Sequence, residues 1–415
     1  MVRMTHSIAI RLITLSLLAI FGASVAFAQS KAYVTNEADG TVSVIDTATN
    51  TVIATVPVEI APLGIAVTPN GAFAYVAHPF SDTVSVISGA TDTVVATVPV
   101  PNPLQIAITP DGAFAYVTGR GVSSGVVSVI STATHTVTAT IPVGGFLGGF
   151  PFAIAITPNG ALAYVVDQFL TVSAISTAAN TVVATINTGE SSQLGVAISP
   201  DGAFVYVTTF RFSSISVIST ATNTVVALIP LSNMDSGGID FTPNGAFAYV
   251  TNPSFDIVSV IDTATLTVAS TVPVGSEPIG LAINPAGTFA YVVNRDHQNV
   301  SVISTLTNSV VATIPVGTVP QFIAFPTKTP ISTLIAQVQA LADGGKLTQN
   351  QANGLIDKLN QLKTKLNDGQ NAAACNQLSS FISQLNAFVN SGALTQAEAQ
   401  PLIDGANALR ASNGC

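Results

Sequence analysis

Short stretches of alternating apolar and polar residues recur along most of the chain, and they predict β-strands. The segment 246–275 (AFAYVTNPSFDIVSVIDTATLTVASTVPVG) contains three such stretches, which are separated by short polar segments. A near copy begins at Ala72 and another at Ala203. Because side chains alternate between the two faces of a strand, this repetition predicts a protein built from one small β-sheet unit, used many times.

All seven tyrosines of the chain mark the same position of this unit: Tyr33, Tyr75, Tyr116, Tyr164, Tyr206, Tyr249 and Tyr291. Successive tyrosines are about 41 to 48 residues apart. A period near 40 with only β-patterns inside it indicates propeller blades of four strands each. In the unit 62–99 these strands are GIAVTP, FAYVAH, TVSVIS and TVVATVPV.

The two ends of the repeated region complete each other. Residues 31–34 (KAYV) read as a second strand without a first, and residues 320–325 (PQFIAF) read as a first strand without a second. The two fragments together make one blade and close the ring, which predicts a seven-bladed all-β propeller over residues 29–326.

The Tyr-Val-Thr-Asn sequences at 33–36 and 249–252 are each followed by a Val-Ser-Val-Ile-Asp run. Over residues 31–326 the pattern resembles the YVTN-family β-propeller repeat, a WD40-like repeat of secreted and surface-layer proteins. The resemblance implies a seven-bladed propeller, often at the cell surface, and it brings no catalytic residues. The wider relatives include lactonase-like propellers.

The repeats differ from one another in only some of their connections. The first-to-second turn and the third-to-fourth turn keep a constant length, whereas the second-to-third loops and the blade-to-blade loops vary. Successive connections alternate between the two faces of a propeller, so the constant turns form one face (the constant face) and the variable loops form the other (the varied face). Since loops carry function on a rigid scaffold, we expect the varied face to bind a ligand. The alternative is that this face merely tolerates insertions.

Charge and aromatic residues support the same face. The chain has 8% charged residues and a net charge of −9, which argues against nucleic acid and anionic membranes as partners. Within residues 32–326 the three arginines all fall in second-to-third loops. An Arg side chain offers a planar fork to carboxylate or phosphate, although each could instead pair with a loop carboxylate. Our ligand-binding candidates are His78, Arg120, Phe146, Phe150, Asp167, Glu190, Phe210, Arg211, Arg295 and His297.

Asp240 breaks the pattern inside a first strand. The equivalent position is Ala in the other six copies, for example Ala66 and Ala282. A carboxylate in such a cramped slot is unfavourable unless it is paired. Asp240 is therefore either an acid with a raised pKa near the central channel, which makes it a weak catalytic candidate, or a carboxylate satisfied by backbone N–H groups and hydroxyl groups.

No catalytic or cofactor motif stands out in the sequence. The three histidines after the N-terminal segment lie in different copies without a metal-ligand partner at suitable spacing, and we expect His135, in a constant turn, to be solvated. The chain contains no Gly-x-Ser-x-Gly, P-loop or EF-hand pattern. We therefore expect neither a metal nor a cofactor, and the absence of Trp argues against a quinone-cofactor propeller.

The N-terminal residues 1–28 read as a signal peptide, with Arg3 and Arg11 before a short apolar stretch and an Ala-Phe-Ala cleavage site at 26–28. The remaining chain has no apolar run long enough to span a membrane, so we expect an exported monomer without an anchor, either in the periplasm, at the cell surface or outside the cell.

The last 85 residues have a helical period instead, after a linker at 327–330. Thr348 and Thr395 stand in matching Leu-Thr-Gln sequences and are expected to cap two helices of a duplicated pair, four helices in all over residues 331–415. Both cysteines, Cys375 and Cys415, lie here and could form a disulfide bond in an oxidising compartment. The segment resembles the FIMAH domain of secreted bacterial proteins, which implies an accessory or attachment role.

These observations predict a secreted or cell-surface propeller scaffold that binds a protein, a glycan or another envelope component through its varied face. The alternative is a lactonase-like or lyase-like enzyme with a site at the mouth of the central channel. Convergence of Asp240, a histidine and an arginine would favour the enzyme, and their separation would favour binding.

Overall fold

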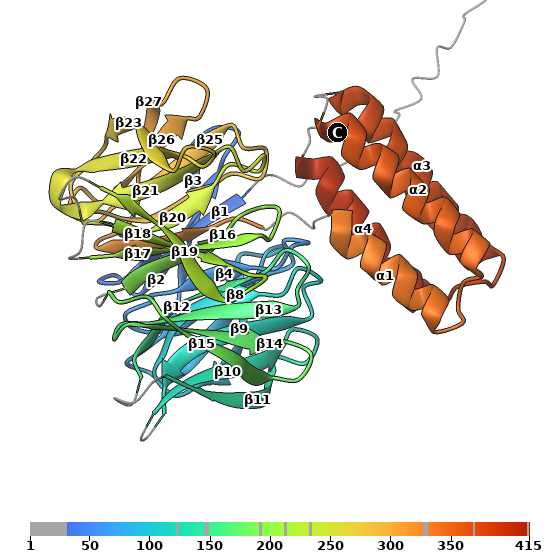
Figure 1. Cartoon of the computed structure of the whole chain (residues 1–415), viewed down its shortest axis with the longest axis horizontal. Coiled ribbons are helices and arrows are strands. Elements are labelled where there is room, and N and C mark those ends of the chain that lie inside the picture. Colours follow the sequence, from blue (N-terminus) through green and yellow to red (C-terminus); the bar gives the residue numbers. More distant parts are fainter. Residues whose placement is uncertain are drawn as a thin grey trace, which may run out of the picture.

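The chain forms a ring of seven β-sheets followed by four helices (Figure 1). The structure is a computed structural model, and it describes residues 31–121, 124–144, 149–190, 193–210, 214–231, 235–326, 331–367, 370–412 and 415. The predicted signal peptide and the predicted linker lie outside these residues. Each sheet has four antiparallel strands in consecutive order, which confirms the seven-bladed propeller with a small all-α domain at its C-terminal end.

The innermost strands of the blades are β28 (Pro320–Ala324), β4 (Ile65–Val67), β8 (Pro103–Ile108), β12 (Pro151–Ile156), β16 (Gln193–Ile198), β20 (Ile239–Phe241) and β24 (Pro278–Ile283). The second strands are β1 (Lys31–Asn36), β5 (Phe73–His78), β9 (Phe114–Arg120), β13 (Leu162–Asp167), β17 (Phe204–Thr209), β21 (Phe247–Asn252) and β25 (Phe289–Asn294). The third strands are β2 (Thr41–Asp46), β6 (Thr83–Ser88), β10 (Gly125–Ser131), β14 (Thr171–Ser176), β18 (Ser214–Ser219), β22 (Ile257–Asp262) and β26 (Asn299–Ser304). The outer strands are β3 (Thr51–Pro57), β7 (Thr93–Pro99), β11 (Thr136–Val143), β15 (Thr181–Asn187), β19 (Thr224–Pro230), β23 (Thr267–Pro273) and β27 (Ser309–Pro315).

The first and last strands of the propeller close the ring. Strand β28 pairs antiparallel with β1, with Ala324 opposite Tyr33 and Ile323 opposite Val34. The innermost strands contact one another in the order β4, β8, β12, β16, β20, β24 and β28, and β28 contacts β4. The predicted closure is confirmed, and it makes blade 1 from β28, β1, β2 and β3, with blades 2 to 7 following in chain order.

The blades are joined by apolar side chains and by two repeated polar contacts. The Thr of the Tyr-Val-Thr pattern donates a hydrogen bond to a backbone carbonyl of the next blade, as Thr35 does to Leu63 at 2.8 Å and Thr251 to Ile279 at 2.9 Å. The Tyr hydroxyl group reaches the third-to-fourth turn of the next blade. There His135, which we expected to be solvated, is instead half-buried, with Nδ1 2.8 Å from the hydroxyl oxygen of Tyr75.

Every outer strand carries a β-bulge at the same place. In blade 1 the register shifts between Val44 and Ile45, so that Ile53 is the extra residue on the outer strand. Each of the other six blades has the same shift. A bulge twists an exposed edge away from regular pairing, which protects these uncharged outer strands from joining other sheets.

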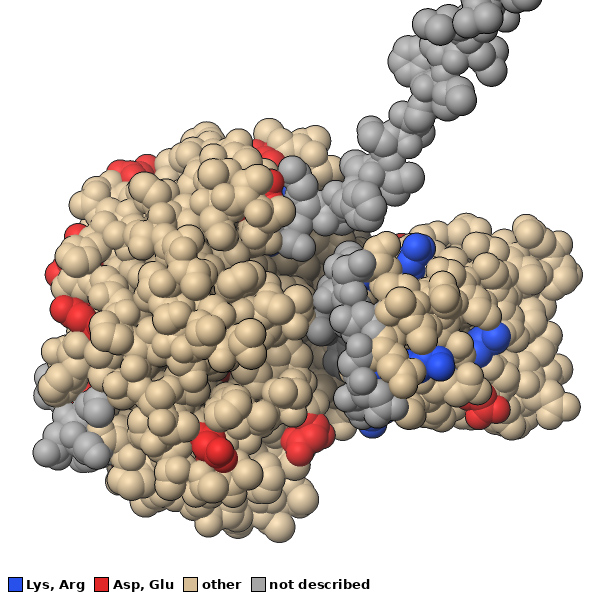
Figure 2. Space-filling model, turned by 90° about the horizontal axis from the view of Figure 1, so that it is seen from above, with Lys and Arg blue, Asp and Glu red and all other residues tan. Residues whose placement is uncertain are grey.

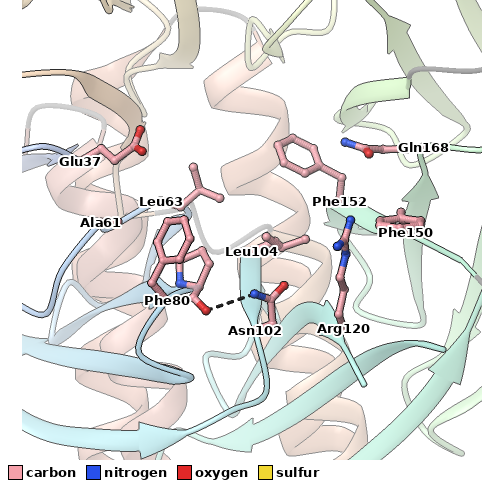
Figure 3. Close-up of a pocket in the computed structure, with 11 residues that line it drawn as sticks. Glu37, Ala61, Leu63, Phe80, Asn102, Leu104, Arg120, Phe150, Phe152 and Gln168 are labelled. Carbon is pink, nitrogen blue, oxygen red and sulfur yellow. Dashed lines mark hydrogen bonds between the residues drawn. The ribbon is translucent and has the colours of Figure 1, made fainter. Parts of the chain in front are cut away.

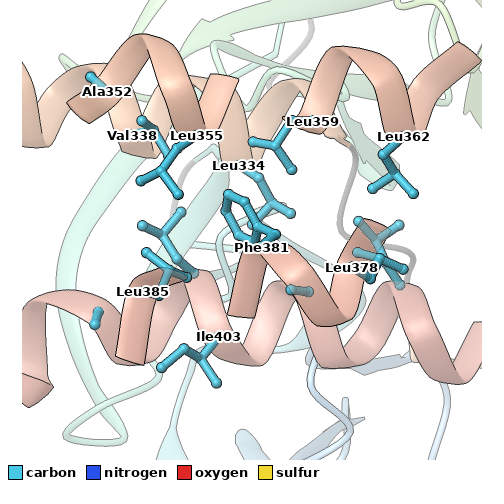
Figure 4. Close-up of a cluster of buried hydrophobic side chains, with 14 of the residues drawn as sticks. Leu334, Val338, Ala352, Leu355, Leu359, Leu362, Leu378, Phe381, Leu385 and Ile403 are labelled. Carbon is cyan, nitrogen blue, oxygen red and sulfur yellow. The ribbon is translucent and has the colours of Figure 1, made fainter. Parts of the chain in front are cut away.

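The C-terminal domain consists of α1 (Ile331–Asp343), α2 (Gln349–Asn367), α3 (Asn371–Asn390) and α4 (Gln396–Ser412), packed around a leucine-rich core (Figure 4). The two predicted threonine caps are confirmed. Thr348 and Gln351 exchange hydrogen bonds at the start of α2, and Thr395 and Glu398 do so at the start of α4. A disulfide bond joins Cys375 in α3 to Cys415.

Charge is distributed unevenly between the two parts. Figure 2 shows acidic side chains spread over the propeller, and both basic and acidic ones on the helical domain. The chain leaves the propeller at Pro326, which pairs with Val67 directly before a first-to-second turn, and therefore on the constant face. No helix of the described residues is long and apolar enough to cross a membrane.

Candidate functional site

A cavity of about 300 Å³ opens on the varied face, over blades 1 to 4 (Figure 3). Its lining comes from second-to-third loops, from blade-to-blade loops and from the strand residues beside them, including Arg120 at the end of β9. The lining residues are Glu37, Ala61, Leu63, Pro79, Phe80, Asn102, Leu104, Arg120, Phe150, Phe152 and Gln168.

The repeat explains why these residues meet. In five blades the blade-to-blade loop ends in a Pro at or just before the start of the innermost strand, whereas Gln193 and Ser236 take this place in blades 5 and 6. In blades 2, 3 and 4 the residues on both sides of the Pro line the cavity. The residues before the Pro are Ala61, Asn102 and Phe150, and those after it are Leu63, Leu104 and Phe152. Since these residues flank the innermost strands, the cavity lies where the varied face meets the central channel.

Arg120 is the one cationic residue of this lining. Its guanidinium carbon lies 3.6 Å from the centre of the Phe150 ring, a cation–π arrangement. Gly119 makes this placement possible, because a Cβ there would come within 2.5 Å of the carbonyl oxygen of Pro101. No carboxylate of the described part of the chain lies within ion-pair distance of Arg120.

Asp167 holds the aromatic side of the cavity in place. Its Oδ1 atom accepts hydrogen bonds from the backbone N–H groups of Phe150 and Phe169, both at 3.0 Å. The two phenyl rings pack edge to face with their centres 4.9 Å apart. Asp167 is buried and does not line the cavity, so its carboxylate positions Phe150 and does not face a ligand.

Asp167 belongs to a repeated slot, three residues after each Tyr, which is buried and polar in six blades. The slot holds Asn36, His78, Asp167, Thr209, Asn252 and Asn294, and glycine takes it in blade 3. Most of these side chains form hydrogen bonds with a nearby loop or with the third strand of the same blade. Asn252, for example, donates to the carbonyl oxygen of Asp235 at 2.7 Å and accepts from Ser259 at 2.7 Å. A comparison of the repeats at this position could have revealed the slot from sequence.

His78 occupies this slot in blade 2 and is completely buried. Burial lowers the pKa of its imidazole to about 4, and the backbone carbonyl groups of Ile60 and Glu59 oppose this shift. Both ring nitrogens of His78 lack a hydrogen-bond partner among the described residues, so neither carbonyl group forms a well-aligned hydrogen bond with the imidazole. A neutral, enclosed imidazole beside the cavity supports its wall and does not contact its contents.

Asp240 lies on β20, where it joins blade 6 to blade 7. Its Oδ2 accepts a hydrogen bond from the backbone N–H of Ile283 at 2.8 Å, and its Oδ1 accepts one from Phe241 at 2.8 Å. The residue keeps some exposed surface, yet the surrounding protein desolvates its carboxyl group. This desolvation raises the pKa of the carboxyl group to about 6, and the two backbone hydrogen bonds oppose the shift.

The remaining candidates are separate from the cavity. Arg295 forms an ion pair with Glu277 at 3.1 Å, and His297 accepts a hydrogen bond from the backbone N–H of Ser276 at 3.1 Å. Glu190 accepts from the hydroxyl group of Ser214 at 2.5 Å. Phe210 is half-buried and does not line the cavity. Phe146 and Arg211 lie outside the described residues.

The structure does not bring the enzyme candidates together. His78, Asp240 and His297 belong to blades 2, 6 and 7, and none of them lines the cavity. In the part of the chain that is described, no group of three or more His, Cys, Asp or Glu side chains could hold a metal ion. The cavity offers a cation, a carboxylate, aromatic and aliphatic walls and two amide groups.

Sequence comparison within the repeat placed Arg120 and Phe150 on the right face but missed the apolar wall. Leu63, Leu104 and Phe152 look like ordinary core residues in the sequence. Phe80 is 75% exposed, and a large aromatic residue in a second-to-third loop was the one available signal.

Two family models match parts of the chain. Residues 208–313 match the model described as a lactonase with a seven-bladed β-propeller, and residues 331–411 match the FIMAH domain. No curated protein matches the sequence. The cavity residues, between Glu37 and Gln168, lie outside the lactonase match.

Several solved structures share the propeller. A chain of hydrazine synthase from Kuenenia stuttgartiensis is 25% identical, with a TM-score of 0.62 over 67% of this chain and 93% of that one. A functionally unknown protein from Desulfotomaculum acetoxidans is 18% identical, with a TM-score of 0.64 over 71% of this chain and 98% of that one. The dihydro-heme d1 dehydrogenase NirN, in complex with DHE, is 18% identical, with a TM-score of 0.54 over 69% of this chain and 64% of that one. The chain is thus a seven-bladed β-propeller, similar to the lactonase propeller family over residues 208–313, joined to a helical domain similar to the FIMAH domain.

Proposed function

We propose that this protein is an exported binding protein, which holds a protein, glycan or other envelope ligand on the varied face of its propeller. The observation that carries the proposal is the cavity itself. Its walls come from connections that vary between repeats and from the strand residues next to them, and it contains an arginine without a carboxylate partner in the described chain.

Exposed apolar side chains around the cavity support a binding role. Phe80 is 75% exposed and Ile60 is 63% exposed, and both lie on the varied face near the cavity. Large exposed apolar residues that gather beside a pocket are typical of interaction sites. The disulfide bond between Cys375 and Cys415 supports an oxidising location outside the cytoplasm.

A matched pair of surface variants tests the proposal. Phe80 is 75% exposed on the varied face, and Leu306 is 92% exposed in a third-to-fourth turn on the constant face. We expect Phe80→Ser to reduce binding to glycan arrays or isolated cell-envelope fractions at least about fivefold, and Leu306→Ser to leave it unchanged. Equal effects of the two variants, or loss of binding only with Leu306→Ser, would contradict the assignment of the face.

The lactonase match favours a second candidate function, hydrolysis of a lactone, with Asp240 as the acid. Its raised pKa suits a general acid, but both of its oxygen atoms already accept backbone hydrogen bonds. Small lactones are screened with the wild type and with Asp240→Ala, and hydrolysis is measured by the release of acid. Turnover that disappears in the variant would establish the enzyme, and turnover in neither protein agrees with binding.

A further inference from the structure

We infer that the cavity on the varied face binds a small monocarboxylic acid with an aromatic or branched apolar body. This inference rests on the proposed function and adds the chemical class of the ligand. The charge, the shape and the rigidity of the cavity support this class of ligand.

The charge of the cavity fits one negative charge. Arg120 is the one cation of the lining, and Glu37 lies on the opposite side (Figure 3). The Glu37 carboxylate already accepts a hydrogen bond from the side-chain amide of Gln321. A second negative charge on the ligand would meet Glu37 without a cation to balance it, so a phosphate or dicarboxylate fits less well than a monocarboxylate.

The arrangement of Arg120 fits a carboxylate in particular. The guanidinium carbon lies 3.6 Å from the centre of the Phe150 ring, and Arg120 is exposed and forms no ion pair among the described residues, so an N–H edge of the guanidinium group is available to a ligand. That edge can donate two parallel hydrogen bonds to the two oxygens of a carboxylate. The separation of Arg120 from Glu37 across the cavity does not suit an α-amino acid, in which the amine and the carboxylate are adjacent.

The remaining walls fit an apolar body. Leu63, Leu104 and Phe152 line the inner side and Phe80 lines the outer side. The volume of about 300 Å³ is at the lower end of ligand pockets, which favours a small molecule over a long chain.

The walls are also fixed before a ligand arrives. Asn102 donates to the carbonyl oxygen of Pro79 at 3.1 Å, and Thr118 donates to that of Phe152 at 2.8 Å. Together with the Asp167 contacts to Phe150, these hydrogen bonds join the loops of blades 2, 3 and 4. A preorganised site loses less conformational freedom on binding.

Ligand-observed NMR with three probes of one shape tests the inference. The probes are phenylacetate, its neutral amide phenylacetamide, and the cation phenethylamine, each added to the full chain at neutral pH and low salt. We expect phenylacetate to bind at least about tenfold more tightly than phenylacetamide, because only the acid forms charge-assisted hydrogen bonds with Arg120. Tighter binding of phenethylamine would show that Glu37, and not Arg120, determines the charge of the ligand, and it would overturn the inference.

Arginine variants provide the matched control. Arg120→Gln should weaken phenylacetate binding at least about tenfold and leave the amide nearly unchanged. Arg295→Gln removes an arginine from the same face, one already paired with Glu277, and should change neither. Equal loss in both variants, or no loss in Arg120→Gln, would overturn the inference, whereas the Phe80→Ser comparison can still support or contradict the proposed function.

Discussion

The hydroxyl group of Tyr291 donates a hydrogen bond of 2.9 Å to Oδ1 of Asn50, 241 residues away, and joins blade 7 to blade 1. The same contact recurs between other neighbouring blades, as from Tyr164 to Asn223 at 2.7 Å. The acceptor always stands in a third-to-fourth turn with a left-handed backbone. The φ angle of this turn residue is between 49° and 55° at Asn50, Asp92, His135, Asn180, Asn223, Leu266 and Asn308.

Leu266 is the exception in this slot, and replacing it should stabilise the protein. A leucine with φ of 55° is strained by roughly 1–2 kcal/mol, which Asn largely avoids. Leu266→Asn would also give the hydroxyl group of Tyr206 the acceptor that the other blades provide, worth about 1 kcal/mol. Since Leu266 packs partly against the core around Tyr206, its loss offsets about 1 kcal/mol. We expect a net gain of roughly 1–2 kcal/mol in the free energy of unfolding, measured with urea.

Leu306 offers the matched control for this prediction, because it stands in the equivalent turn of blade 7 and is 92% exposed. Leu306→Asn should change stability by less than about 0.5 kcal/mol. Combining Leu266→Asn with Tyr206→Phe should remove the part of the gain that comes from the hydrogen bond. A gain that persists in full would show that backbone strain alone explains the effect.

Thr251→Val should destabilise the propeller by about 1 kcal/mol. Val fits the position, as Val293 shows at the equivalent place of blade 7, but it cannot donate to the carbonyl oxygen of Ile279. A buried carbonyl group without its partner destabilises the folded state. Thermal or urea unfolding measures the change, and Thr265→Val, in an exposed turn of the same blade, is the control with almost no expected effect.

Asp240→Ala should stabilise the protein increasingly as pH rises from about 4 to about 7. The folded pKa of about 6 is above the ordinary value of 3.8, so the folded state binds the proton more tightly than the unfolded state. Ionisation therefore destabilises the folded wild type as pH rises between these values, by roughly 3 kcal/mol at most. Alanine removes this pH-dependent destabilisation, and the other six blades already have Ala at this position.

The difference in unfolding free energy between wild type and Asp240→Ala, measured across this pH range, checks the prediction and cancels the other titrating groups. The reverse change, Ala66→Asp in blade 2, should destabilise the protein and introduce the same pH dependence. A difference that stays constant with pH would show that the carboxyl group of Asp240 titrates normally.

The repeat predicted the blades, their order and the closure of the ring because internal copies act as their own comparison. Residues 31–34 and 320–325 identified one divided blade, and the pairing of Tyr33 with Ala324 follows from it. The sequence interpretation did not recognise the buried position three residues after each Tyr. Asp167 and His78 were expected to bind a ligand, but each is the last residue of a second strand and is buried.

The site could be predicted only as a face. Arg120 and Arg295 both follow a second strand, and we expected both to bind a ligand, although only Arg295 has an acidic neighbour, Asp296, in the sequence. In the structure Arg295 meets Glu277, whereas Arg120 meets the ring of Phe150. The choice of partner depends on how the loops of neighbouring blades approach each other, which spacing along the chain does not encode.

Reduction of the disulfide bond between Cys375 and Cys415 should destabilise the helical domain and leave the propeller intact. The bond closes a loop of 40 residues, worth about 4 kcal/mol in the chain-entropy model. Circular dichroism of the helices during heating measures the loss, and a Cys375→Ala/Cys415→Ala double variant should show the same transition with or without reductant. A reductant effect on the double variant would point to another cause.

The chain leaves the propeller at Pro326, beside Val67, so the helical domain follows from the constant face, opposite the cavity. A partner that bound the helical domain would therefore hold the propeller from its constant face, and the cavity on the varied face would stay open. Attachment through the helices and binding in the cavity would therefore not exclude each other.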